Sequence, residues 1–215
     1  MANYGELRVV SDLDDVHADT ATRVIEFTNR LYRPAASPLT LEDYNDHFAE
    51  MWGVDTDETM RRWGIFCKEW MANVTPMEGA GQTQRDMPRN AHMEILTARD
   101  AESSGDATRL WVSRHLARVS GVNFANVGWG KNADAHKRTK REELILMKPH
   151  MFIEDQPRHL TSLVDLPIRD LVVFTRPWNR GLSHPRIMRV SSQAVLSELI
   201  QERAAEKLVE AERAA

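Results

Sequence analysis

Residues 8–16 of the chain read RVVSDLDDV, a short apolar segment that leads directly into a cluster of carboxylates. Its first half is rich in β-branched side chains, and we expect a buried strand over residues 7–10. The side chains of Asp12, Asp14 and Asp15 follow at once. Because an open α/β sheet binds its ligands at the carboxyl ends of its strands, this stretch predicts a first strand and a polar site at its end.

Four more apolar segments follow, and stretches with helical periodicity separate most of them. A repeated order of strand and helix is typical of a parallel sheet that helices cover on both faces. The predicted fold class is therefore α/β, with a Rossmann-like parallel sheet. The further predicted strands are residues 93–96, 122–127, 151–153 and 171–174.

The connection between the first two predicted strands is far longer than a whole βαβ unit, which takes roughly 30 residues. Its periodicity predicts helices over 18–32, 40–51 and 55–71, the second of them opened by a capping box of Thr40 and Asp43. We therefore expect a helical cap, inserted after the first strand, over the active edge of the sheet. Its aromatic side chains either form the core of the cap or turn one or two rings toward the cleft to stack on a base. They are Phe48, Trp52, Trp63, Phe66 and Trp70.

The rest of the chain completes the predicted layout. We expect a polar loop over 100–106, a helix over 107–117 and a terminal helix over 192–215. The terminal helix has two interpretations, packing on its own domain or pairing with a second copy in a homodimer. The predicted units are a core of residues 1–17 and 91–190, a cap of residues 18–90 and a C-terminal helix of residues 191–215.

The composition excludes several classes of protein. A length of 215 residues, 42% of them hydrophobic and 28% charged, fits one globular domain with a modest insertion. The formal net charge of −4 gives no basic footprint for duplex nucleic acid, but a single nucleotide can still bind a local positive pocket.

The single cysteine and the absence of long apolar stretches bear on the compartment. Cys67 is the only cysteine, so an intramolecular disulfide is excluded and a reducing compartment is indicated. No stretch approaches the roughly 18 apolar residues of a membrane span, and the start MANYGELR lacks the apolar core of a signal peptide. We expect a cytoplasmic protein with no membrane partner.

The carboxylate cluster predicts a metal. Ionised carboxylates this close repel one another unless a cation lies among them or one is protonated, and magnesium is the hard divalent ion that suits them. A second acidic pair, Glu154 and Asp155, follows the apolar segment MFI. Magnesium commonly binds one or two carboxylates together with a substrate phosphate, which Asp12 and Asp155 would satisfy.

An aspartate can also act as the nucleophile in phosphate chemistry, giving an aspartyl-phosphate that water hydrolyses. That route needs an acid for the leaving oxygen, for which Asp14 is available, and donors for the phosphate oxygens. The Thr97 hydroxyl, the following N–H of Ala98 and the Lys140 ammonium are candidates. Each feature alone is also found in solvated loops and helix starts. Their joint order along the chain, each next to an apolar strand, favours the catalytic interpretation.

The motifs VVSDLDDV, EILTAR, Lys140 and MFIEDQ resemble the four motifs of the haloacid dehalogenase-like superfamily of phosphohydrolases. Within it, DLDDVHADT, LTARD, HKRTK, FIEDQPRHL and RPWNR resemble the cytosolic type C 5′-nucleotidase, or 5′(3′)-deoxyribonucleotidase, family. The resemblance covers residues 9–180. It implies a haloacid dehalogenase-like core with a helical cap after the first strand.

The resemblance also implies residue roles. Asp12 would be the nucleophile, and Asp14 the general acid and base whose main-chain carbonyl also ligates magnesium. Thr97 and Lys140 would hold the phosphate, and Asp155 would complete the metal site.

Three positions depart from the family pattern or compete within it. His17 stands where an apolar residue is common, and it is a candidate for the substrate pocket together with Phe48, Trp52 and Arg99. Arg99 either clamps the phosphate or pairs with an acidic neighbour. Glu154 replaces the commoner aspartate, and direct or water-mediated metal ligation stays open. Lys137 competes with Lys140 as the phosphate lysine.

The sequence thus predicts a magnesium-dependent phosphomonoesterase for nucleoside or deoxynucleoside 5′-monophosphates. One alternative keeps the chemistry and changes the substrate to a small sugar phosphate, glycolate phosphate or a nucleic-acid terminal phosphate. Another is a non-catalytic phosphate-binding protein on the same fold.

Overall fold

The computed structural model describes residues 5–33, 36–125 and 138–214. Its centre is a six-stranded sheet in the order β3-β2-β1-β4-β5-β6, and all neighbouring strands are parallel. The predicted α/β class with a parallel sheet is therefore confirmed. The strands are β1 (Leu7–Ser11), β2 (Ala91–Thr97), β3 (Val119–Phe124), β4 (Met151–Glu154), β5 (Asp170–Phe174) and β6 (Ile187–Val190).

Helices cover both faces of the sheet, as the near-continuous apolar character of its strands requires. On one face, Leu196 and Ile200 of α8 (Gln193–Ala214) pack in one buried cluster with Val9 and Met93. The opposite face holds a second cluster, in which helices α6 (Lys140–Met147) and α7 (Pro157–Thr161) cover side chains such as Phe152. The core is thus two apolar layers with the sheet between them.

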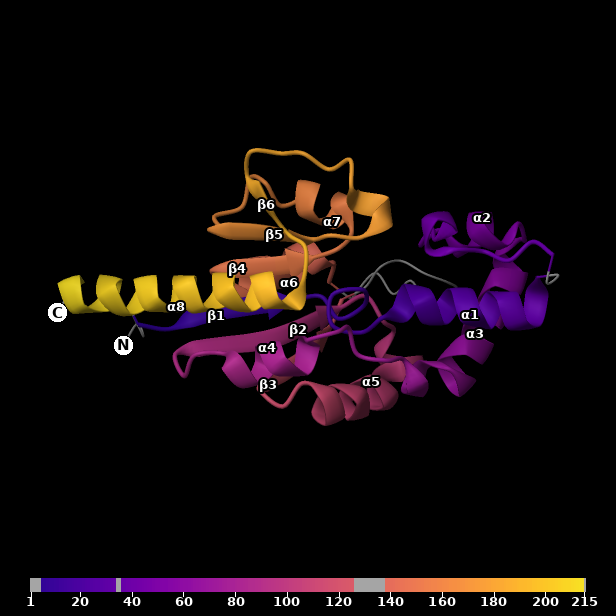
Figure 1. Ribbon diagram of the computed structural model, residues 1–215, viewed down its shortest axis with the longest axis horizontal. Coiled ribbons are helices and arrows are strands. Elements are labelled where there is room, and N and C mark those ends of the chain that lie inside the picture. Colours follow the sequence, from indigo (N-terminus) through magenta and orange to yellow (C-terminus); the bar gives the residue numbers. More distant parts are fainter. Residues whose placement is uncertain (1–4, 34–35, 126–137, 215) are drawn as a thin grey trace.

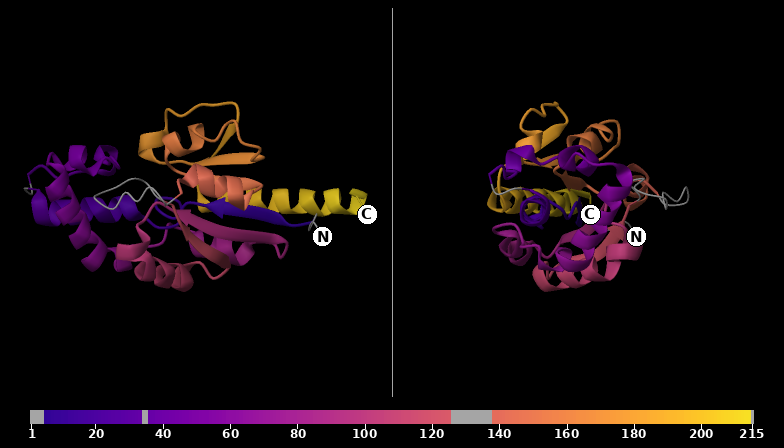
Figure 2. Two further views of the ribbon diagram at one scale, coloured as in Figure 1. Left: turned by 180° about the vertical axis from the view of Figure 1, so that it is seen from behind. Right: turned by 90° about the vertical axis from the view of Figure 1, so that its right-hand side faces the viewer.

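Most of the insert between β1 and β2, including α1 to α3, lies beyond the carboxyl ends of the strands (Figures 1 and 2). Its helices α1 (Thr20–Tyr32), α2 (Phe48–Trp52) and α3 (Thr56–Glu69) share a buried aromatic cluster centred on Phe27. The short turn η1 (Leu41–Asp43) lies between α1 and α2, and the short turn η2 (Met71–Asn73) follows α3. The last helix of the insert, α4 (Ala80–Asp86), packs against α8 beside the sheet.

Side-chain caps explain where three helices begin. The carboxylate of Asp55 accepts the N–H of Glu58 at 2.9 Å and opens α3. Asp100 accepts the N–H of Ser103 at 2.7 Å and opens α5 (Ala101–His115), and Thr139 opens α6 with a capping box. Each cap satisfies a backbone donor that the helix itself leaves without a partner.

Several boundaries differ from the prediction. The capping box of Thr40 and Asp43 is present, but the turn that begins there is only the short η1. The helix expected over 40–51 is shorter and corresponds to α2. The segment expected as a polar loop over 100–106 is helical, because Asp100 caps α5 there. Strand β3 begins three residues before the predicted position, and residues 126 and 127 of that prediction lie outside the described residues.

Strand β6 has no counterpart in the prediction. Its four residues, IMRV, are too short and too mixed to stand out from a loop punctuated by prolines and glycine. Pairing with β5 makes it the edge of the sheet. No helix in the described part of the chain combines the length and the apolar character that crossing a membrane would take.

Candidate active site

The order of the strands reverses between β1 and β4, which is where an open α/β sheet forms its ligand crevice. Asp12 follows β1 directly, and its N–H donates to the carbonyl of Ile153 in β4 at 2.8 Å. Asp155 follows β4, and Thr97 ends β2 on the other side of β1. Parallel strands therefore bring together residues that are far apart in the sequence.

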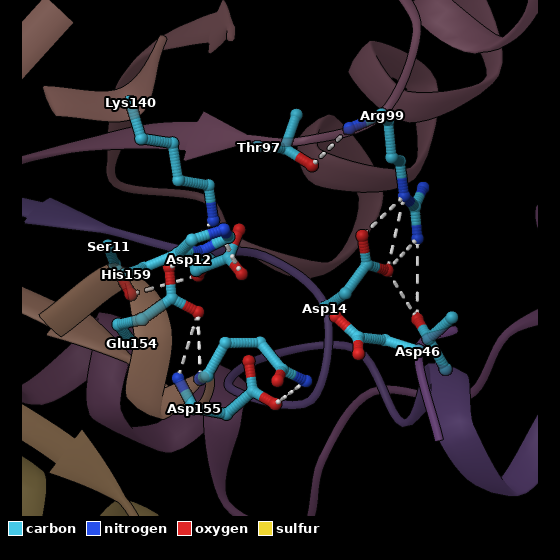
Figure 3. Close-up of polar contacts among 12 residues, drawn as sticks. Ser11, Asp12, Asp14, Asp46, Thr97, Arg99, Lys140, Glu154, Asp155 and His159 are labelled. Atoms are coloured by element: carbon cyan, nitrogen blue, oxygen red, sulfur yellow. Dashed lines mark hydrogen bonds and ion pairs between the residues drawn. The ribbon is translucent and has the colours of Figure 1, made fainter. Parts of the chain in front are cut away.

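Lys140 joins this cluster from the first turn of α6. Its Nζ lies 3.0 Å from Oδ2 of Asp12 and 2.7 Å from Oε2 of Glu154, and all three side chains are buried (Figure 3). Burial by itself lowers the pKa of a lysine, but the negative charges of Asp12 and Glu154 outweigh it and raise the pKa of Lys140. Lys140 is therefore a fixed cation beside Asp12 and Glu154, whereas Lys137 lies outside the described residues.

Glu154 is fully occupied by donors. Its Oε1 accepts the N–H groups of Asp155 and Gln156 at 3.0 and 3.1 Å. Its Oε2 accepts Lys140 and lies 2.9 Å from Nδ1 of His159. Burial alone would raise the pKa of Glu154, yet the charge of Lys140 and the contact with His159 bring it well below the usual range. Glu154 is thus an ionised carboxylate whose lone pairs are used within the protein.

Asp12, Glu154 and Asp155 each offer an oxygen within 4.8 Å of the others, and all three are buried. Oδ1 of Asp12 is buried and has no hydrogen-bond partner among the described residues. Burial, followed by the nearby charge of Glu154, raises the pKa values of Asp12 and Asp155 well above normal. A divalent cation would give Oδ1 of Asp12 a partner and would offset the repulsion between the carboxylates. The three residues therefore fit a metal site.

Asp14 is held by a two-pronged ion pair. Nε and Nη2 of Arg99 donate to Oδ2 and Oδ1 of Asp14 at 3.0 and 2.7 Å, and the Thr20 hydroxyl also donates to Oδ1. Burial acts to raise the pKa of Asp14, but the charge and hydrogen bonds of Arg99, with the Thr20 contact, lower it. Of the two roles left open for Arg99, the structure shows the pairing with an acidic neighbour.

The turn after β2 carries the predicted phosphate donors. The Thr97 side chain is fully buried, and its hydroxyl accepts the N–H of Arg99 at 3.2 Å. Ala98 and Arg99 line the cleft together with Asp12, Asp14 and Lys140. Thr97 itself is not among the residues that line the cleft, and the role of these groups in binding phosphate stays a prediction.

The cap supplies the wall of the cleft opposite these groups. Tyr44, Asp46, Phe48 and Trp63 line it. The rings of Phe48 and Trp63 are stacked, with centroids 4.8 Å apart and planes 25° from parallel. Phe48 also stacks on Trp52 and Trp63 on Phe66, so the four rings form one stack, of which Phe48 and Trp63 line the cleft. An aromatic wall suits a leaving group that carries a ring.

Two residues expected in the substrate pocket do not line it. His17 is fully buried, with Nε2 2.9 Å from the hydroxyl of Ser11, because the turn after β1 folds it under the sheet end. Trp52 stacks behind Phe48 at 5.2 Å and donates its indole N–H to Thr28 at 2.9 Å, which places it in the core of the cap. Burial lowers the pKa of His17 to about 4.

The structure adds contacts of three residues that lie in motifs of the family resemblance but were not predicted as site residues, namely His159, Arg158 and Trp178. His159 contacts Glu154 from the first turn of α7, five residues along the chain. A polar residue on the helix that directly follows β4 was the sequence signal from which this contact could have been predicted. Arg158 pairs with Asp46 of the cap, a contact between distant segments that leaves no local signal. Trp178, in the loop after β5, donates to Asp155.

The parallel sheet with this strand order, the helical insert after β1 and the carboxylates at its switch point define a hydrolase of the haloacid dehalogenase-like superfamily. A family model described as "5' nucleotidase, deoxy (Pyrimidine), cytosolic type C protein" matches residues 6–206. The chain belongs to this family, and is therefore an enzyme of the phosphatase and nucleotidase class.

Solved structures agree on the fold. A haloacid dehalogenase-superfamily hydrolase of subfamily IA from Geobacter sulfurreducens PCA is similar at 17% identity, with a TM-score of 0.57 and coverage of 91% of this chain and 97% of that one. A hydrolase of the same class from Deinococcus radiodurans R1, solved with bound phosphate and sodium, gives 15% identity, a TM-score of 0.57 and coverage of 94% and 98%.

A third similar structure is a hydrolase of this class from Bacillus subtilis, solved bound to magnesium, with 13% identity, a TM-score of 0.56 and coverage of 91% and 98%. A search of curated proteins gave no match.

Proposed function

We propose that this enzyme is a magnesium-dependent phosphomonoesterase that hydrolyses nucleoside or deoxynucleoside 5′-monophosphates through an aspartyl-phosphate. The observation that carries the proposal is the buried Oδ1 of Asp12, without a partner, in a carboxylate cluster that faces a cleft with an aromatic wall. The family match supports a nucleotidase, and the wall of Phe48 and Trp63 supports a substrate with a base.

In the first step, a carboxylate oxygen of Asp12 attacks phosphorus and the bond to the nucleoside oxygen breaks. Asp14 gives its proton to the departing oxygen, so the nucleoside leaves as an alcohol. Lys140, the Thr97 hydroxyl and the N–H of Ala98 bind the phosphate oxygens and offset their negative charge. The second step is attack of water on phosphorus, with Asp14 taking the proton of the water and Asp12 released as a carboxylate.

The ion pair with Arg99 fits the second step and constrains the first. Two N–H donors on Asp14 favour its ionised form, which accepts a proton from water. For Asp14 to act as an acid, Arg99 has to release it. A dianionic phosphate in the cleft is the group that attracts a guanidinium away, because Arg99 lines the same cleft.

A magnesium ion would be held by the carboxylates of Asp12 and Asp155 and the main-chain carbonyl of Asp14. Bound there, it would offset the negative charge of the phosphate and screen the carboxylates from one another. Glu154 uses its lone pairs on Lys140, His159 and backbone N–H groups, and we assign it the positioning of Lys140 rather than direct ligation.

In this proposal residues 18–90 act as the cap, which selects the leaving group and excludes bulk water. The structure of the related Bacillus subtilis hydrolase bound to magnesium is described as revealing interdomain movement, which supports a mobile arrangement of such parts. The proposed substrate class and the family description, which names a cytosolic protein, both support a cytoplasmic location for this enzyme.

The test is phosphate release from a panel of nucleoside and deoxynucleoside monophosphates, small sugar phosphates and a 3′-phosphorylated oligonucleotide, with magnesium and with chelator. Asp12→Asn is the control, and it should abolish turnover while its folding is intact. Metal-dependent turnover of the mononucleotides supports the proposal. Turnover confined to sugar phosphates or the oligonucleotide would leave the proposed mechanism standing and contradict the proposed substrate class. No phosphate release from any compound of the panel would favour a non-catalytic phosphate-binding protein.

A further inference from the structure

Trp178, in the loop after β5, contacts both Asp155 and the cap residue Tyr44. It lies in the turn η3 (Pro177–Asn179), and its indole N–H donates to Oδ2 of Asp155 at 2.7 Å. The side-chain amide of Gln156 donates to the same oxygen at 3.0 Å. Two donors on one oxygen fix the rotation of the carboxylate and direct its other oxygen elsewhere.

The other side of the indole contacts the cap. The ring of Tyr44 lies 4.7 Å from that of Trp178, at an angle of 42° between the planes, and Tyr44 is only 9% exposed. Tyr44 directly follows η1 and also lines the cleft. One side chain therefore contacts a cap residue with its ring and donates its N–H to Asp155 of the carboxylate cluster.

Two ion pairs hold the same cap segment to the core on either side of this contact. Asp46 pairs with Arg158 at the start of α7. Glu42 pairs with Arg180, with 3.0 Å between Oε1 and Nη1. Residues 42–46, which we call the cap latch, thus dock on the two core loops that follow β4 and β5.

We propose that Trp178 is a positioning residue that couples docking of the cap latch to the orientation of Asp155, so that cation binding and cap closure favour each other. The inference rests on the metal site of the proposed function. The coupling has to be reciprocal: if a docked latch strengthens cation binding, a bound cation strengthens docking by the same factor. Partners that orient metal ligands commonly change metal affinity by 10- to 100-fold.

The proposal separates into two contacts, and each has a matched variant. Trp178→Phe keeps an aromatic ring against Tyr44 and removes the N–H donor to Asp155. Tyr44→Leu keeps an apolar side chain and the N–H donor, and removes the ring contact. Trp52→Phe is the control, because it removes an indole N–H from a buried hydrogen bond inside the cap, away from the cluster.

The first measurement is binding of magnesium and manganese to the full chain by calorimetry, with no substrate present. We expect Trp178→Phe to weaken binding by about tenfold or more, and Trp52→Phe to leave it within twofold of the unsubstituted protein. Thermal unfolding of the metal-free proteins checks that the two variants lose comparable stability, so that a general loss of folding cannot produce the difference.

The second measurement is limited proteolysis of the cap with and without magnesium. In the unsubstituted protein and in Trp52→Phe, the metal should slow cleavage within the cap several-fold. In Trp178→Phe and Tyr44→Leu the rate should be the same with and without metal, at concentrations that saturate each variant.

Different results overturn different claims. Equal metal affinity in Trp178→Phe and the unsubstituted protein would show that the indole only packs, and this inference would fail while the metal site stood. Metal-dependent protection that persists in Tyr44→Leu would also overturn the coupling. No metal binding by the unsubstituted protein would overturn the metal site itself, and the coupling with it.

Discussion

At the scale of single residues, the buried carboxylate of Asp12, the proposed nucleophile, lowers the stability of the fold. Burial and the neighbouring Glu154 raise its pKa well above the usual value, and the attraction of Lys140 does not cancel them. A carboxyl group whose folded pKa is raised destabilises the fold at neutral pH, because the unfolded chain binds fewer protons there. The same charge is what a nucleophile and metal ligand require.

Asp12→Asn should therefore stabilise the metal-free protein while abolishing turnover. We expect a gain of roughly 1 kcal/mol in the free energy of unfolding at pH 7 in chelator, because the neutral amide no longer repels Glu154. Magnesium at 100 times its dissociation constant should add about 2.7 kcal/mol to the unsubstituted protein and less to the variant. Denaturant unfolding with and without magnesium measures both, and a variant less stable than the unsubstituted protein in chelator would contradict this account.

His17 gives a prediction for the pH dependence of stability. Burial lowers its folded pKa to about 4, against 6.5 for an ordinary histidine. The folded state thus binds the proton less well than the unfolded state, so stability is present above pH 6.5 and is lost as the pH falls toward 4. Between pH 7 and pH 5 the loss should be about 2 kcal/mol.

The variant His17→Leu isolates this contribution. Leucine fills the buried position and cannot bind a proton, and the Ser11 hydroxyl keeps its contact with the Asp12 carbonyl. The difference in unfolding free energy between pH 7 and pH 5 should be about 2 kcal/mol smaller in the variant than in the unsubstituted protein. Urea titrations at the two pH values decide it, and parallel pH dependence in both proteins would exclude His17 as the titrating group.

At the scale of elements, the N-cap residue of α3 stabilises the helix that carries a residue of the cleft wall. Asp55 caps the helix that carries Trp63. We expect Asp55→Ala to lower the free energy of unfolding by about 1 kcal/mol, because the N–H of Glu58 loses its partner. Asp57→Ala is the matched control, since Asp57 lies in the first turn of the same helix without capping it. Equal losses in the two variants would mean that the cap hydrogen bond contributes nothing particular.

The elements that the sequence predicted well are those with a strong local signal. Strand β1 is a run of buried, mostly apolar residues interrupted only by Arg8, and helix α3 begins at the capping residue Asp55. Helix α2 and strand β6 have neither, because five and four residues hold too little periodicity to separate from a loop. Their structure comes from their neighbours: Phe48 and Trp52 join the cap's aromatic cluster, and β6 pairs with β5.

At the scale of the whole molecule, the cap and the core divide the work of recognition. In the proposed function, the core presents the groups for phosphate and metal, and the cap presents the aromatic wall. Trp63→Leu should lower kcat/KM for a nucleoside monophosphate by about 10- to 100-fold, because stacking on a base is worth about 1–3 kcal/mol. Turnover of acetyl phosphate, which has no ring, should change little.

Trp70→Leu is the control for that experiment. Trp70 contacts Phe27 and Arg23 within the cap and does not line the cleft. A steady-state comparison of both substrates across both variants gives the answer. An equal effect of Trp63→Leu on the nucleotide and on acetyl phosphate would remove the stacking role of the wall.

The sequence by itself determined the class of the fold, the cap insertion and the candidate residues at the strand ends. Apolar segments, capping residues and short motifs are local properties, and the carboxyl ends of parallel strands meet at one edge whatever the detailed packing. The sequence alone therefore predicts one site for Asp12, Asp14, Thr97, Lys140 and Asp155.

Only the tertiary structure decided which groups touch and which face the cleft. It paired Arg99 with Asp14, turned His17 and Trp52 into the interior, and linked Trp178 to both Tyr44 and Asp155. These contacts join segments far apart in the chain, and their energies depend on distance, burial and orientation rather than on residue order. No periodicity or motif encodes such quantities, because they arise when the packed layers fix the side chains in space.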